Sequence, residues 1–136
     1  MISHDPVWRD RVLAVLRIVT ALMFLQHGLA KHFGFPHVAN FDNLKVLSLI
    51  GLAGAIEIVG SLLLLVGLFT RAAAFIMSGE MAVAYFMSHA SRSFFPLLNQ
   101  GELAALYCFV FLYFVFSGPG AWSIDRMRSK PERSVA

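Results

Sequence analysis

The chain has 136 residues, of which 58% are apolar and only 14% charged, and its mean hydropathy is +0.71. A water-soluble domain of this size cannot bury thirteen phenylalanines among so many other apolar side chains, so the composition excludes a soluble globule and favours a membrane protein. The net charge of +3 does not indicate nucleic-acid binding, because the basic residues flank apolar runs. A single cysteine rules out an internal disulfide framework or CxxC pair.

Four apolar runs follow one another along the chain. A helix that crosses a hydrocarbon core of about 30 Å needs roughly 20 mostly apolar residues. The first run has basic flanks but no A-x-A-like cleavage site, so we expect it to stay as a membrane anchor. The second is rich in small residues that allow close helix contact in lipid, and only a tight turn separates it from the third. We place the four spans at about 9–30, 44–68, 72–90 and 101–119.

These spans predict a single all-α domain over residues 1–136, an antiparallel up-down bundle of four transmembrane helices followed by a polar tail at 120–136. We expect the end of this tail, residues 126–136, to be mobile. Four spans place both termini on one side of the membrane. Seven basic residues fall on that side and three on the other, so the positive-inside rule predicts that both termini are cytoplasmic.

Ionisable groups inside the spans are costly in hydrocarbon, so each is either a candidate site residue or one member of a buried ion pair. Arg17, Glu57 and Glu80 lie at depth. Glycines share the face of Glu57 and allow a neighbouring helix to approach it. We therefore expect an ion pair between Arg17 and either Glu57 or Glu80, which is either structural or part of a site. Glu80 lies roughly 180° around its helix from His89, so we do not expect those two in one pocket.

Histidines gather at the predicted outer ends of the spans. A metal or haem site is disfavoured, because the sequence has no HxxxH or ExxH spacing and histidine is common at membrane interfaces. His27 and Lys31 differ from the rest. They lie four residues apart on one helix and form a donor pair suited to a quinone carbonyl or a small anion.

The segment 94–107 places Glu102 at the start of the fourth apolar run. Asn99 and Glu102 match a capping-box pattern, with Asn99 at the N-cap. The topology puts the same carboxylate at the outer mouth of the bundle, level with three other candidates: His27, Lys31 and His89. We therefore expect Glu102 both to cap the helix and to face a ligand. The face that continues from it lines a pocket for a flat apolar ligand or serves helix packing, and it contains Leu106, Phe109 and Tyr113.

Four short motifs stand in order along nearly the whole chain: HGxxK, a Glu and Gly before a Leu run that ends in GLFTR, NxGE, and GPGxxSID. Together they resemble the DoxX family of small four-helix bacterial membrane proteins. The positions that match the family pattern are His27, Gly28, Lys31, Glu57, Gly60, Thr70, Arg71, Asn99, Glu102, Gly118, Pro119, Gly120 and Asp125.

The resemblance implies a role in membrane redox chemistry. Some members look like subunits of thiosulfate:quinone oxidoreductase or terminal oxidase assemblies, and others are linked to thiol and oxidative-stress complexes. We expect this chain to lack the extended hydrophilic partner domain of some relatives, since these 136 residues contain no such segment. We therefore expect a multi-pass inner-membrane protein that contributes a quinone or small-anion pocket to an oxidoreductase complex, with electrons supplied by a partner. Whether the chain is itself an enzyme stays open.

In this hypothesis His27 and Lys31 donate to the ligand head, and Glu102 orients them or relays a proton. Two alternatives remain. The first is a small-solute or proton-coupled transporter, which would require a homodimer because four spans lack the paired broken helices of secondary transporters. The second is a non-catalytic assembly or anchoring subunit in which every charge is structural.

Overall fold

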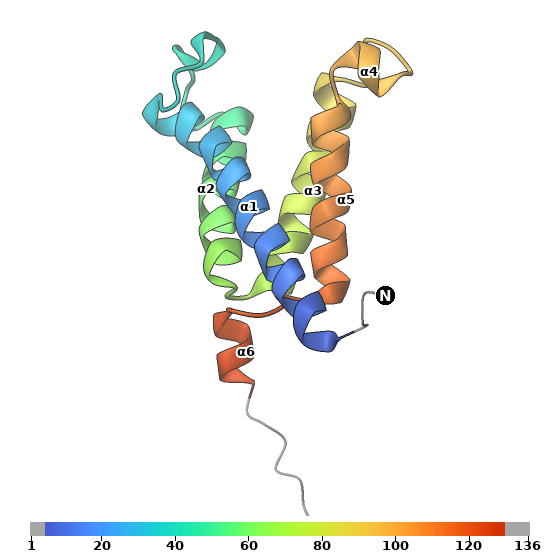
Figure 1. Ribbon diagram of the computed structural model, residues 1–136. Helices are drawn as coiled ribbons and strands as arrows, with labels where there is room; N and C mark the ends of the chain where they lie inside the picture. The colour runs from blue at the N-terminus through green and yellow to red at the C-terminus, as the bar shows by residue number, and fades with distance from the viewer. Residues whose placement is uncertain (1–4, 130–136) are drawn as a thin grey trace, which may run out of the picture.

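The computed structural model describes residues 5–129, whose regular secondary structure is entirely helical, with no strand. The long helices alternate in direction (Figure 1). They are α1 (Pro6–Phe33), α2 (Leu49–Val66), α3 (Thr70–Ser88) and α5 (Glu102–Ser117). The short ones are η1 (Ala39–Phe41), α4 (Pro96–Asn99) and α6 (Ile124–Arg128). The all-α prediction is confirmed, and each predicted apolar run overlaps one long helix.

Local signals decide where these helices begin and end. Asp5 caps α1 by accepting a hydrogen bond from the Val7 N–H, and a proline stands at the first helical position. Helix α2 begins at Leu49, later than the predicted residue 44, because the Ser48 side chain caps it. The helix ends at Val66, and Gly67 follows as its C-terminal cap with a φ of 68° that suits glycine.

The bundle consists of two helix pairs, α1 with α2 and α3 with α5. Figure 1 shows the pairs close together at the end that carries α6 and splayed apart at the opposite end. We name these the terminal end and the loop end. A core of mainly apolar side chains fills the space between the helices, including Phe24, Met77 and Phe111. A Cβ at Gly60 would lie 2.5 Å from the Met77 Sδ, so glycine lets α2 and α3 approach closely.

The outside of the bundle is strongly apolar. Large apolar side chains such as Leu62, Phe75 and Phe109 are exposed there. Helices α1 and α2 are each long and apolar enough to cross a membrane, and α5 is apolar but shorter, with 16 residues. Water-soluble proteins rarely expose an apolar surface of this extent, so the helices point to a membrane protein.

Arg17 lies fully buried at the terminal end, where it joins two segments. Its guanidinium donates hydrogen bonds of 2.6–3.1 Å to the carbonyl oxygens of Leu64, Leu65, Pro119, Ala121 and Trp122. The predicted ion pair of Arg17 with Glu57 or Glu80 is therefore wrong. The guanidinium fork instead satisfies the free carbonyls at the end of α2 and holds the loop before α6 against them.

Asp125 of α6 holds the turn between α2 and α3 through backbone hydrogen bonds. Its carboxylate accepts hydrogen bonds of 2.9 Å from the N–H groups of Phe69 and Thr70, and its own N–H donates to the Gly67 carbonyl at 2.9 Å. These bonds satisfy free donors at the start of α3. The predicted tail at 120–136 thus starts as part of the bundle, since residues 120–125 dock on it, and the segment expected to be mobile, 126–136, begins inside α6. Residues 130–136 lie outside the described part of the chain.

The same contacts predict a pH dependence of stability. Burial alone would raise the pKa of Asp125, but hydrogen bonds from Thr70 and Phe69 and the charge of Arg128 outweigh it and hold the pKa below its ordinary value of 3.8. A carboxyl group with a depressed folded pKa stabilises the protein above its unfolded pKa, and this contribution is lost as the pH falls through the folded pKa. We expect Asp125→Asn to lower the unfolding temperature at neutral pH and to approach the wild type below pH 3.8.

Thermal unfolding in detergent micelles across this pH range measures the difference. The matched control is Asp42→Asn, because the Asp42 carboxylate is exposed and its ion pair within the described residues is with an exposed His37, and such pairs contribute little. A difference between Asp125→Asn and wild type that stayed constant down to the acid end would contradict the prediction.

Candidate functional site

A buried ion pair joins α1 to α2 in the loop-end half of the bundle. The Lys31 Nζ donates to the Glu57 Oε1 at 2.5 Å, and the two side chains are 13% and 3% exposed. Glycines make the approach possible, since a Cβ at Gly28 would lie 2.7 Å from the Gly54 carbonyl oxygen. The pair explains why a lysine near the end of the first apolar run accompanies a glutamate in the second.

Glu80 lies near this pair on the third helix. Gly60 and Met77 contact each other across α2 and α3. Because the two helices are antiparallel, three residues back from Gly60 along α2 and three residues forward from Met77 along α3 lead to the same level of the bundle. Glu57 therefore lies opposite Glu80. The charges of Glu57 and Lys31 both act on Glu80. We call Lys31, Glu57 and Glu80 the carboxylate cluster.

Several oxygens of the carboxylate cluster have no hydrogen-bond partner within residues 5–129. They are the Glu57 Oε2 and both carboxyl oxygens of Glu80, all shielded from solvent. Buried polar atoms are almost always hydrogen-bonded, and leaving one unpaired costs about 1–3 kcal/mol. The cluster therefore offers acceptors for protons, water or the hydroxyl groups of a ligand.

Aromatic side chains border the region from α1 and α5. The Tyr107 ring centroid lies 4.9 Å from that of Phe24 and 6.1 Å from that of His27, edge to face in both cases. The Tyr107 hydroxyl is buried and has no partner among the described residues. His27 lies four residues, about one helical turn, before Lys31 on α1, so the imidazole is on the side of the helix that carries the cluster's lysine. Tyr107 is a candidate that the sequence prediction missed, although a hydroxyl within an apolar run is a signal for it.

Glu102 lies apart from the carboxylate cluster. It is the exposed first residue of α5, the N-cap is Gly101, and no side chain caps the helix. The predicted capping box with Asn99 is therefore wrong. The face that continues from Glu102 points outward, since Leu106, Phe109 and Tyr113 are exposed. The start of α5 and the end of α1 also lie on different arms of the splayed loop end (Figure 1).

Asn99 organises the loop between α3 and α5. Its amide donates to the Tyr85 hydroxyl at 3.1 Å and to the Ser93 carbonyl at 3.0 Å, and its Oδ1 accepts from the Gly101 N–H at 2.7 Å. His89 Nδ1 contacts the Asn99 carbonyl oxygen at 3.0 Å. The structure thus brings His89 and Asn99 together in a local network, away from the carboxylate cluster.

The remaining histidines of the described region make separate local contacts. His32 Nε2 lies 2.8 Å from the Gly51 carbonyl oxygen, and His37 Nε2 lies 2.8 Å from an Asp42 carboxylate oxygen. Within residues 5–129, no three His, Cys, Asp or Glu side chains gather as a metal site.

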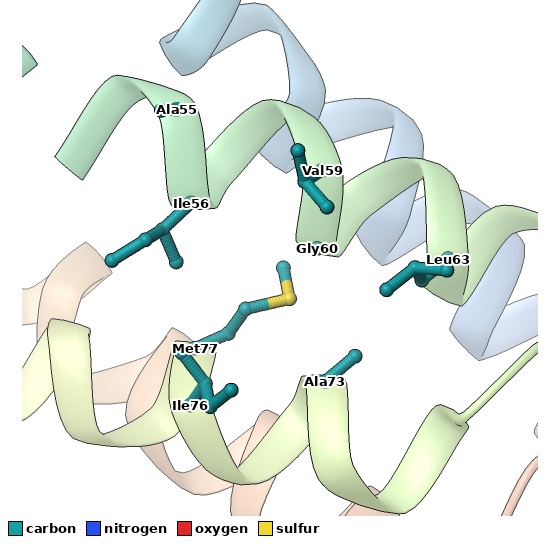
Figure 2. A pocket seen from close by; sticks show the side chains of 8 residues that line it. All are labelled: Ala55, Ile56, Val59, Gly60, Leu63, Ala73, Ile76 and Met77. Carbon is teal, nitrogen blue, oxygen red and sulfur yellow. The ribbon is translucent and has the colours of Figure 1, made fainter. Parts of the chain in front are cut away.

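An apolar groove of about 300 Å³ opens between α2 and α3, one helical turn from Glu57 and Glu80. Figure 2 shows the Met77 side chain reaching across it toward Gly60, with Ile56 on the facing helix. Methionine is flexible and adapts to what lies against it. The groove therefore gives the neighbourhood of the cluster an apolar flank that faces outward.

Comparison with known proteins relates this arrangement to a family. The family model named DoxX matches residues 12–90, which include the whole carboxylate cluster. An uncharacterised protein of Haemophilus influenzae is 54% identical over 122 residues, which cover 87% of this chain and 91% of that protein. An uncharacterised membrane protein of Mycobacterium tuberculosis is 30% identical over 141 residues, which cover 85% of this chain and 80% of that protein. No solved structure matches the chain.

Proposed function

The chain belongs to the DoxX family, and on that premise we propose that it binds the head group of a membrane quinone or quinol at the carboxylate cluster, as part of an oxidoreductase complex. One observation carries the proposal: Glu57 and Glu80 hold three buried oxygens without a partner among the described residues. A carboxylate accepts from a quinol hydroxyl, and a protonated carboxyl group donates to a quinone carbonyl. The cluster thus suits either redox form of the head group.

The residues take distinct roles in this function. Reduction of a quinone takes up two electrons and two protons, and oxidation of a quinol releases them. The electrons pass to or from a partner subunit, while Glu80 and Glu57 exchange the protons with the head group. Lys31 holds Glu57 in place, and Tyr107 and His27 offer an aromatic border for a flat ring. With two acidic groups against one lysine, the cluster favours a hydrogen-bond donor over a small anion.

The membrane arrangement that we propose is a four-span inner-membrane protein with both termini in the cytoplasm. Helices α3 and α5 pack on each other and complete the bundle beside α1 and α2, the two helices that are long and apolar enough to cross a membrane. Basic and aromatic side chains meet at the terminal end, where Arg11 lies 5.1 Å from the ring centroid of Trp8 and Arg128 lies 5.5 Å from that of Phe69. Such residues are typical of a cytoplasmic membrane interface.

Binding of a quinol analogue by the purified protein tests the proposal. We expect Glu80→Gln to weaken binding by about tenfold or more, because a hydrogen bond to a charged group contributes about 1.5–3 kcal/mol. Glu102→Gln is the matched control, since it removes the same charge from an exposed carboxylate of α5. Titration calorimetry in detergent gives both affinities. Equal binding by wild type and Glu80→Gln, or no binding by either, would show the proposal to be wrong.

Proton-coupled transport of a small solute is a second candidate, favoured by the two facing carboxylates inside the bundle. In this case protonation of Glu57 or Glu80 would accompany movement of the solute, and a homodimer would be needed. Uptake into proteoliposomes driven by a pH gradient separates this candidate from quinone binding.

A further inference from the structure

A second cavity, of about 250 Å³, lies under the loop 34–48 at the end of α1. Most of its exposed surface is polar and comes from side chains and backbone that include Lys31, His32 and Asp42, while Ala30 and Leu44 are among the apolar residues of its wall. Lys31 thus borders the cavity on one side and bonds to Glu57 on the other. The lysine separates this cavity from the buried carboxyl groups.

Exposure falls stepwise along the polar groups that lead inward from the loop. The side chains of His37 and Asp42 at the surface are 69% and 52% exposed, Lys31 is 13% exposed and Glu57 is 3% exposed. The inner end of this series carries the oxygens that lack partners within the described residues. A buried water needs room and two to four polar partners, and its share of liquid volume is about 30 Å³. The cavity has room for several waters, and its lining supplies such partners.

We propose that this cavity is an aqueous vestibule through which water and hydronium ions reach the carboxylate cluster from the loop end, with Lys31 between the vestibule and Glu57. In the inward step a hydronium ion transfers one proton to a carboxylate oxygen and leaves as water. In the outward step a carboxyl group returns the proton to water. The vestibule supplies the protons that quinone reduction consumes and removes those that quinol oxidation releases, and in this use it rests on the proposed function.

Cysteine labelling tests whether water enters the vestibule. In a Cys108→Ser background, Ala30→Cys places a thiol on the cavity wall at a residue that is only 4% exposed. Ala21→Cys is the matched control on the same helix, 1% exposed and set in the apolar core. The reagent is a cationic, membrane-impermeant thiosulfonate added to sealed vesicles, and it reacts only with thiols that water reaches as thiolates. We expect modification of Ala30→Cys and none of Ala21→Cys.

Leu44→Cys provides a second vestibule position in the loop, in case Ala30→Cys does not fold. If neither vestibule cysteine reacts, or if only the loop position reacts in a folded Ala30→Cys protein, water stops short of Lys31 and the inference is wrong. Equal reaction at Ala30 and Ala21 also overturns it, because the core would then be open without a defined route.

Proton exchange at the carboxyl groups tests the inner part of the route. At an acidic pH that protonates the carboxyl groups, the infrared carbonyl band of Glu80, identified by its loss in Glu80→Gln, shifts when deuterium replaces hydrogen. We expect the shift to be slower in Leu44→Trp, which fills the cavity, and an unchanged rate would overturn the route. Neither experiment uses a quinone. If water reaches the vestibule but the protein binds no quinol analogue, the proposed function is wrong and the vestibule stands. If the protein binds a quinol analogue but no water reaches the vestibule, only the vestibule is wrong.

Discussion

Replacing Lys31 by methionine is expected to lower the free energy of unfolding by about 3–5 kcal/mol, which is typical of removing one partner of a buried ion pair. Methionine keeps an unbranched apolar stem but lacks the ammonium that donates to the Glu57 Oε1 at 2.5 Å. The Glu57 carboxylate then stays buried without a cation and without a hydrogen-bond donor on either oxygen. Unfolding in mixed micelles followed by circular dichroism measures the loss.

Two further variants separate the ion pair from the rest of the side chain. Lys31→Met combined with Glu57→Gln is expected to recover much of the stability, because no charge is then buried alone. Lys45→Met makes the same substitution at an exposed lysine of the loop, where a change within about 0.5 kcal/mol is expected. If Lys31→Met costs no more than Lys45→Met, the ion pair does not stabilise the fold.

The helices are predictable from the sequence because apolar runs of this length have one stable form in lipid, but the partners of the charges depend on depth. Arg17 and Lys31 lie on one helix, 14 residues apart, which corresponds to about 21 Å at 1.5 Å per residue. Glu57 bonds to Lys31 and is therefore out of reach of Arg17. Counting charges inside the spans could not reveal this, because the relative depth of residues on two helices depends on how the helices pack.

The choice of face on α5 failed for a different reason. The helix is apolar all round, so periodicity does not indicate which side faces the core. Glu102 suggested one face, which turned out to be exposed, while the buried face carries Tyr107, Phe111 and Phe114. Only packing against the other helices distinguishes the two, and that information is not local to the segment.

At the terminal end, the motifs in the sequence contain the residues that make the key contacts, but the sequence did not indicate that their role is structural. GLFTR and GPGxxSID are far apart in the chain, yet Asp125 of the second caps the turn within the first. Arg71 of the first donates to the Val115 and Phe116 carbonyls at the end of α5. These motifs form one structural unit, which separates them from the candidate site at the other end of the bundle.

Arg17→Lys is expected to destabilise this unit by about 3 kcal/mol or more, although it keeps the positive charge. Hydrogen bonds to charged groups contribute about 1.5–3 kcal/mol each, and the guanidinium makes five. A lysine ammonium has three donors on a single atom and cannot span carbonyls on both α2 and the loop before α6. The free energy of unfolding in mixed micelles gives the loss, and trypsin cleavage after Arg126 or Arg128 reports release of the loop.

The control is Arg11→Lys, the same substitution at an exposed arginine of α1, where little change is expected. Arg17 and Asp125 hold the loop before α6 from two sides, so each substitution already loosens the contact that the other needs. The double variant Arg17→Lys with Asp125→Asn should therefore lose less stability than the sum of the two single losses. Additive losses, or a trypsin-resistant loop in Arg17→Lys, would mean that the two residues do not hold one structural unit.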